Sequence, residues 1–172
     1  MKKFLVGVAS LAAIASAFAC SEPVTALASA RNVGHSSSSA VLVECPSSES
    51  HSSSVLVTPL GGSVTAGGST ISIPAGAVLV PTTITVTVPA SQYMEVDITA
   101  NGAEHFSFHA PVTVSVSYAR CTRSDLDKDP LSVWYIDSQT KALLQNMGGT
   151  DDKTARIVTF VTDHLSGYAV AN

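Results

Sequence analysis

Apolar and polar side chains alternate along much of this chain, and a period of two residues predicts β-strands. Three runs show the alternation most clearly, at residues 83–88, 93–98 and 112–118. Each run places mainly Val, Ile or Met on one face and mainly Thr, Ser, Asp or Glu on the other. We therefore expect antiparallel sheets that bury one face and leave the polar face in water.

Two further runs, residues 131–136 and 157–161, are apolar on both faces, so we expect them in central strands. Turn residues separate the runs from Val55 onward: Gly61-Gly62, Gly67-Gly68, Pro74, Pro89, Asn101-Gly102 and Gly148-Gly149. This spacing predicts an all-β fold, an antiparallel β-sandwich of about nine or ten short strands over residues 55–172. Residues 141–147 come nearest to a helical pattern, but the segment is short.

The first 19 residues have the composition of an export signal. Lys2 and Lys3 precede an uncharged apolar run over residues 4–19, which ends in small residues directly before Cys20. The run is short for a bilayer span, which takes about 20 apolar residues. A cysteine at this position is typical of bacterial lipoproteins, so we expect a signal peptide over residues 1–19 and a lipid on Cys20.

Two alternatives compete with this interpretation. Ala17-x-Ala19 also suits an ordinary signal peptidase, and lipoprotein signals usually carry Leu where Ala17 stands. Cleavage after Ala30 would remove Cys20 and leave a periplasmic or secreted protein that starts at Arg31. If Cys20 is lipidated, Ser21 after it favours the outer membrane, by resemblance to the sorting rules of bacteria with two membranes.

Residues 20–54 are expected to carry the lipid and to form a serine-rich tether, because serine tracts bury too little apolar area to offset backbone entropy. An apolar island at residues 40–45 interrupts the tracts and could form an edge strand. His35 and His51, one in each tract, are weak metal-ligand candidates and are more typical of a solvated linker.

Charge and cysteine content narrow the possible partners. Without residues 1–19 the chain has 7 Lys and Arg against 13 Asp and Glu, a net charge of 7 − 13 = −6. Nucleic acid is not an expected partner, because phosphate binding requires a basic patch. If Cys20 is lipidated or removed, Cys45 and Cys121 remain as a pair, and we expect a disulfide between them. Two buried free thiols are the alternative.

Four segments together resemble the ZU-five domain, named after zonula occludens and uncoordinated-five proteins, and more closely its exported bacterial relatives. They are Gly61-Gly62-Ser63-Val64, Ile71-Ser72-Ile73-Pro74-Ala75-Gly76-Ala77, the stretch at 106–114 and the stretch at 162–170. The resemblance covers about residues 56–171. It implies a β-sandwich that serves binding and assembly, and Cys45-Pro46 and Cys121 fit the cysteine positions of the exported relatives.

The triplet His164-Leu165-Ser166 is the sharpest candidate for chemistry. In some ZU-five proteins the matching triplet, with Phe in the middle, undergoes self-cleavage before the serine. By that resemblance, the Ser166 hydroxyl would attack the Leu165 carbonyl while His164 moves the proton. Leu165 departs from the family motif, and a hydrogen-bonded turn before the last strand is the alternative, so we expect an intact chain.

Asp125, Asp127 and Asp129 have the alternating spacing of a calcium loop, but Pro130 stands where that loop requires glycine. They remain weak metal candidates beside the alternative of a solvated acidic hairpin. On a straight strand, His105 and His109 would lie about 13 Å apart, too far to share an ion. No phosphate loop, dinucleotide fingerprint or nucleophile elbow occurs, so no cofactor is expected.

These observations favour a non-enzymatic, exported and lipid-anchored binding or structural module of the cell envelope. Its expected partners are a membrane, through the N-terminal lipid, and an unknown protein or glycan. A self-cleaving domain that uses His164 and Ser166 is one alternative. A calcium-dependent surface or glycan-binding module that uses the three aspartates is the other.

Overall fold

A computed structural model describes residues 40–172 of the chain. The expected signal peptide, Cys20 and His35 lie outside the described residues. The described part contains eleven strands: β1 (His51–Val57), β2 (Gly62–Ala66), β3 (Ser69–Ile73), β4 (Thr82–Val88), β5 (Glu95–Ala100), β6 (Phe106–Ser117), β7 (Ser132–Ile136), β8 (Leu143–Gly148), β9 (Thr150–Asp152), β10 (Ile157–Leu165) and β11 (Gly167–Ala171). One 3-10 turn, η1 (Ser124–Asp127), joins β6 to β7.

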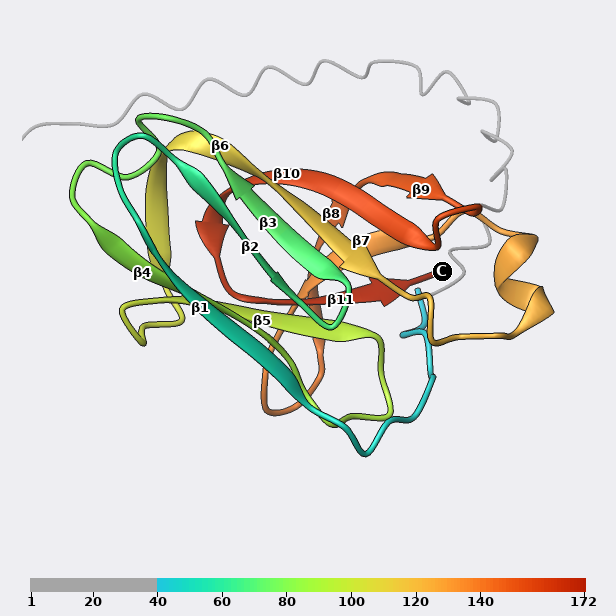
Figure 1. Cartoon of the computed structure of the whole chain (residues 1–172). Helices are drawn as coiled ribbons and strands as arrows, with labels where there is room; N and C mark the ends of the chain where they lie inside the picture. The colour runs from blue at the N-terminus through green and yellow to red at the C-terminus, as the bar shows by residue number, and fades with distance from the viewer. Residues whose placement is uncertain (1–39) are drawn as a thin grey trace, which may run out of the picture. The chain divides into compact units, whose positions relative to one another are not determined.

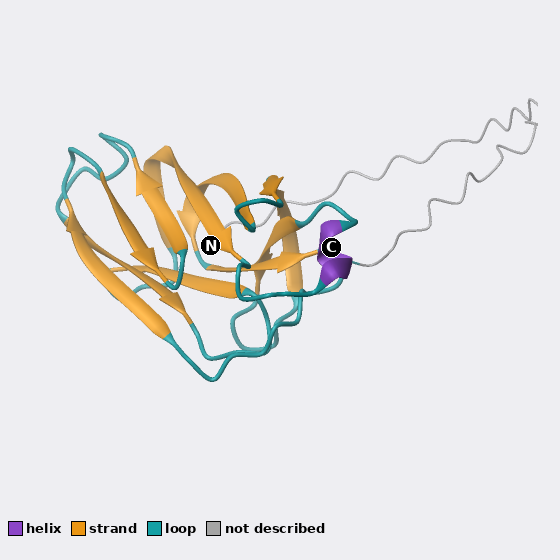
Figure 2. Cartoon of the chain, turned by 45° about the vertical axis from the view of Figure 1, so that its right-hand side comes forward, coloured by secondary structure: helices purple, strands orange, loops and turns teal. Residues whose placement is uncertain are grey.

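The strands form two antiparallel sheets that pack face to face, as Figures 1 and 2 show. One sheet has the order β1-β4-β5-β11-β7-β8, and the other has the order β2-β3-β6-β10-β9. The predicted β-sandwich is therefore confirmed. The segment at 141–147, which came nearest to a helical pattern, contributes strand β8 instead. Strands β7 and β10 each have a neighbour on both sides, as their double-sided apolar sequences predicted.

The core lies between the two sheets and follows the alternation of the sequence. In β4, Ile84, Val86 and Val88 are at most 5% exposed, while the threonines between them are partly exposed. The facing strand β6 contributes three valines, and Tyr118 and Tyr168 are fully buried at 0% exposure. Burial of apolar side chains on this scale is the main stabilising contribution to such a fold.

The serines at 52–54 are not part of a tether. They lie in β1, which pairs with β4 from His51↔Val88 to Val57↔Thr82. The hydroxyls of Ser52 and Ser54 lie 2.9 and 2.7 Å from those of Thr87 and Thr85. The tether prediction failed here because an edge strand needs few apolar side chains of its own when its neighbour satisfies its backbone. The folded body thus begins before Val55.

The two ends of the sandwich differ in what they contain. At one end, which we call the entry end, the first described residues meet the C-terminus, and Val41 donates a backbone hydrogen bond to Asn172. At the opposite end, the loop end, lie the β1–β2 turn at 58–61 and the β3–β4 loop at 74–81. No helix of the described residues is long and apolar enough to cross a membrane.

Candidate functional site

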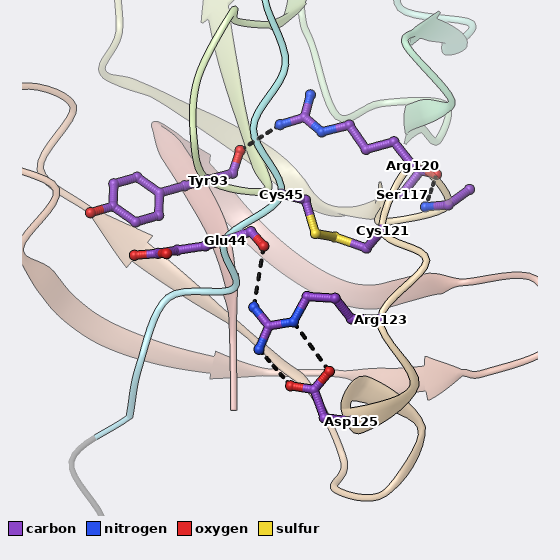
Figure 3. The surroundings of a disulfide bond; sticks show 9 residues. Glu44, Cys45, Tyr93, Ser117, Arg120, Cys121, Arg123 and Asp125 are labelled. Carbon is purple, nitrogen blue, oxygen red and sulfur yellow. Dashed lines mark hydrogen bonds and ion pairs between the residues drawn. A yellow bond between two sulfur atoms is a disulfide. The ribbon is translucent and has the colours of Figure 1, made fainter.

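A disulfide joins Cys45 to Cys121 at the entry end, as the cysteine count predicted (Figure 3). The two Cα atoms are 5.5 Å apart, within the usual range for disulfides, and both residues are buried. The bond links the segment before β1 to the loop that follows β6, across a sequence separation of 76 residues. It therefore ties the N-terminal segment to the body.

Backbone hydrogen bonds hold the same segment from both sides. The Val43 amide donates to the Val170 carbonyl at 2.9 Å, and the Val43 carbonyl accepts from Met94 at 3.0 Å. The Cys45 amide donates to Gln92 at 2.7 Å. The apolar island at residues 40–45 was a candidate for an edge strand. It makes isolated bridges instead, at Leu42 and Glu44, because it lies where β5 and β11 diverge.

Two arginines next to the disulfide add side-chain contacts to this junction. Arg120 donates to the Tyr93 carbonyl at 2.7 Å, and Arg123 donates to the Glu44 carbonyl at 3.4 Å (Figure 3). Arg123 also donates two hydrogen bonds to the Asp125 carboxylate, and these bonds lower the pKa of Asp125. We use the name entry junction for residues 41–47 together with these partners.

The three candidate calcium ligands do not converge on one point. Asp125 pairs with Arg123, and the Asp127 carboxylate lies 3.5 Å from Arg156. Asp129 offers its backbone carbonyl to the Lys153 ammonium at 2.6 Å. In residues 40–172 no group of three or more His, Cys, Asp or Glu side chains is placed to hold a metal, and this includes His51, His105 and His109.

The Lys153 ammonium sits among oxygen atoms of this acidic region. It also donates to the Leu126 carbonyl and lies 2.6 Å from the Asp151 carboxylate. Asp151 accepts further hydrogen bonds from the Tyr118 hydroxyl at 2.7 Å and the Leu131 amide at 2.9 Å. Although burial raises the pKa of Asp151, these donors outweigh it and hold the pKa below its usual value. The chain's own cation thus balances this carboxylate.

The self-cleavage candidates lie at the passage from β10 to β11. The His164 Nδ1 atom contacts Asp163 at 3.0 Å and Thr162 at 3.3 Å, and no hydrogen bond of the described residues joins His164 to Ser166. Ser166 is 5% exposed, and its carbonyl accepts from the Ile98 amide. The Tyr168 hydroxyl donates to the His164 carbonyl at 2.6 Å, and burial raises the pKa of Tyr168 to about 12.

A buried charge cluster on the outer face of β5 was missed by the sequence reasoning. Glu95 was expected on a wet face, but it is 2% exposed and its carboxylate lies 2.6 Å from the Lys141 ammonium. Lys141 lies in the β7–β8 turn, and its φ of 60° is in the left-handed region. One signal in the sequence could have revealed this burial. Strand β7 is apolar on both faces, which implied that the outer face of its sheet is covered.

Asp97 lies on the same face of β5, two residues from Glu95. Its Oδ1 atom is buried without a partner among the described residues. Burial raises the pKa of Asp97, the Glu95 carboxylate raises it further, and Lys141 lowers it. The ionised form of Asp97 is therefore disfavoured in the folded protein.

Comparison with known proteins adds no family to these observations: no protein-family model matches the chain, and a search of curated proteins found no match. The resemblance to ZU-five domains therefore stays a prediction.

We predict that non-reducing peptide mapping of the purified protein recovers the Cys45 and Cys121 peptides as one linked species. Closing a loop of this length stabilises a fold by about 4 kcal/mol in the chain-entropy model. The Cys45→Ser/Cys121→Ser double variant should therefore unfold at clearly lower denaturant concentration than the wild type. Two freely alkylated thiols in undenatured protein would contradict the prediction.

We predict that Asp97→Asn stabilises the protein, and that the gain grows with pH. The folded-state pKa of Asp97 lies above the usual pKa of an aspartate, so its favourable protonated form is fully present below about pH 4. That contribution is lost as pH rises through the folded-state pKa, whereas asparagine stays neutral. Urea unfolding at several pH values measures the difference. Asp129→Asn removes the same charge from an exposed loop and is the control; an equal gain there would refute the assignment.

Proposed function

We propose that this chain is an exported, lipid-anchored module of the bacterial cell envelope that works by binding or assembly rather than by catalysis. One observation carries most of the argument: the Cys45–Cys121 disulfide. Disulfides of this kind form in oxidising compartments and are rare in the cytosol. The disulfide thus supports the export that the first 19 residues predict.

The entry junction suits a protein held by its N-terminal region. A load applied through Cys20 would reach the body at residues 41–47, where Val43 bonds both Val170 and Met94. The disulfide follows at Cys45, so a covalent bond backs up these hydrogen bonds. The junction would therefore transmit the load to the sandwich without peeling β1 from β4.

A binding role is supported by what the candidate catalytic groups do in the fold. His164 engages Asp163 and Thr162, and the Ser166 carbonyl anchors β5 through Ile98. Through these contacts the triplet helps to hold the passage from β10 to β11, where the chain crosses between the two sheets. The resemblance to ZU-five domains supports the same proposal, because it implies binding and assembly. The proposed partner is a protein or glycan.

We predict that Cys20→Ser abolishes metabolic labelling with a fatty acid and releases the protein from washed membranes, because the thiol is the proposed site of acylation. The Cys45→Ser/Cys121→Ser variant keeps Cys20 and is the control, since it should still be labelled. Persistent labelling of Cys20→Ser, or a mature chain that starts at Arg31, would overturn the anchor.

We predict that the chain stays intact at Leu165–Ser166. Without backbone strain the amide is far more stable than the ester that an acyl shift produces, and Leu165 gives no aromatic ring to clamp a twisted peptide. Tryptic mapping should recover residues 157–172 as one peptide, in the wild type and in Ser166→Ala alike. A peptide that ends at Leu165 in the wild type and disappears in Ser166→Ala would instead establish self-processing.

A further inference from the structure

Three large aliphatic side chains protrude into solvent at the loop end of the sandwich. Leu60 in the β1–β2 turn is 87% exposed, and Leu79 and Val80 in the β3–β4 loop are 62% and 65% exposed. Single exposed apolar residues are common on protein surfaces and need no explanation. Three on neighbouring turns form a feature of their own, which we call the apolar tip.

Hydrogen bonds between the turns show that the three residues belong to one end of the molecule. The Gly76 amide donates to the Pro59 carbonyl at 2.8 Å, which joins the β3–β4 loop to the β1–β2 turn. Val57, just before that turn, pairs with Thr82, just after Val80. Leu56, in β1 just before the β1–β2 turn, is also 61% exposed.

The tip belongs to a long stretch without charge. Residues 52–94 contain no Asp, Glu, Lys, Arg or His. Ionisable residues at this end lie outside that stretch: Glu104 and His105 in the β5–β6 loop, Lys141 in the β7–β8 turn, and Asp163 and His164 before the passage from β10 to β11. By contrast, the β6–β7 connection at the entry end carries charges of both signs: the arginines at 120 and 123, Lys128, and the aspartates at 125, 127 and 129. The two turns of the tip are thus free of charged side chains, although other charged residues lie at the same end.

Several backbone polar groups of the tip are hydrogen-bonded within the protein, which suits an apolar environment. The Gly61 amide donates to the Thr58 carbonyl at 2.9 Å, and the Ala77 amide donates to the Pro74 carbonyl at 3.2 Å. The Thr82 hydroxyl donates to the Val80 carbonyl at 2.9 Å. Polar backbone groups that enter a bilayer must be paired internally, so these bonds lower the cost of insertion.

We propose that the apolar tip inserts into the interfacial region of a lipid bilayer, with Leu60, Leu79 and Val80 as the inserted side chains. An uncharged tip that protrudes from two hydrogen-bonded turns suits a fluid apolar phase. The charged β6–β7 side faces away from the lipid in this orientation. Because the two turns of the tip carry no charge, binding needs no anionic lipid and is insensitive to salt.

If the proposed lipid on Cys20 is present, the tip and the lipid can reach the same membrane. The 20 residues from Cys20 to residue 39 extend to at most about 70 Å. The 12 residues of β6, the longest strand described, span about 40 Å. Two linked contacts with one bilayer bind it more strongly together than either contact does alone. This last step alone rests on the proposed function; insertion of the tip does not.

The test uses the full mature chain with Cys20→Ser, so that no lipid anchor contributes. Flotation with phosphatidylcholine vesicles, with and without phosphatidylglycerol, measures binding at low and high salt. The unlipidated protein should float with both vesicle types. The triple variant Leu60→Ser/Leu79→Ser/Val80→Ser should bind at least tenfold more weakly, since burying one leucine is worth about tenfold in partition. Leu144→Ser/Val161→Ser changes two exposed apolar residues elsewhere and should bind like the parent.

A second measurement places the tip in the bilayer. In Leu79→Trp, bromine-labelled lipid chains should quench the new tryptophan, whereas in Val161→Trp they should not. Failure of the parent to float, equal binding by the triple variant, salt-sensitive binding only to phosphatidylglycerol vesicles, or no quenching in Leu79→Trp would each overturn the proposal. Because Cys20 is absent throughout, these outcomes are independent of whether the native protein is lipidated.

Discussion

The passage of the chain from β10 to β11 determines how the two sheets of this protein sit on each other. The two strands are consecutive but lie in different sheets, and Ser166 alone separates them. Each is flanked on both sides, β10 by β6 and β9, and β11 by β5 and β7. A shift of one residue in either strand would turn its apolar side chains out of the core. The passage therefore fixes both registers at once.

Side chains around Ser166 hold this passage in place. The Tyr168 hydroxyl reaches back to the His164 carbonyl, and the Ile98 amide reaches the Ser166 carbonyl from β5. Leu165 is 1% exposed, so it packs into the core at the point where the chain changes sheet. The triplet that resembles a cleavage motif therefore also has structural contacts in this fold.

The strands could be predicted from the sequence, whereas the outer surfaces could not. Alternation in β4 and β6 reports which side chains face the core, and this needs no knowledge of neighbours. The burial of Glu95 depends on Lys141, which lies 46 positions away and arrives through a left-handed turn. Likewise, Ser52 and Ser54 form a strand because β4 offers paired threonines. Both are tertiary effects that local pattern does not contain.

Within the candidate site, the disulfide was predictable and its surroundings were not. If Cys20 is lipidated or removed, counting cysteines leaves Cys45 and Cys121 as the pair, and the geometry agrees. The contacts of Arg120 and Arg123 with backbone carbonyls leave no trace in the sequence. The apolar tip is an intermediate case: the uncharged stretch at 52–94 is visible in the sequence, but only the fold brings its two turns together.

The most direct test of the account is the intact mass of the protein extracted in detergent from the native envelope. The proposed anchored module should give one species with a diacylglycerol-modified Cys20 at its N-terminus and an intact Leu165–Ser166 bond, two hydrogens lighter than the reduced chain because of the disulfide. A chain that starts at Arg31 without lipid would contradict the anchored module at the centre of the account. A species that ends at Leu165 would contradict its non-catalytic character.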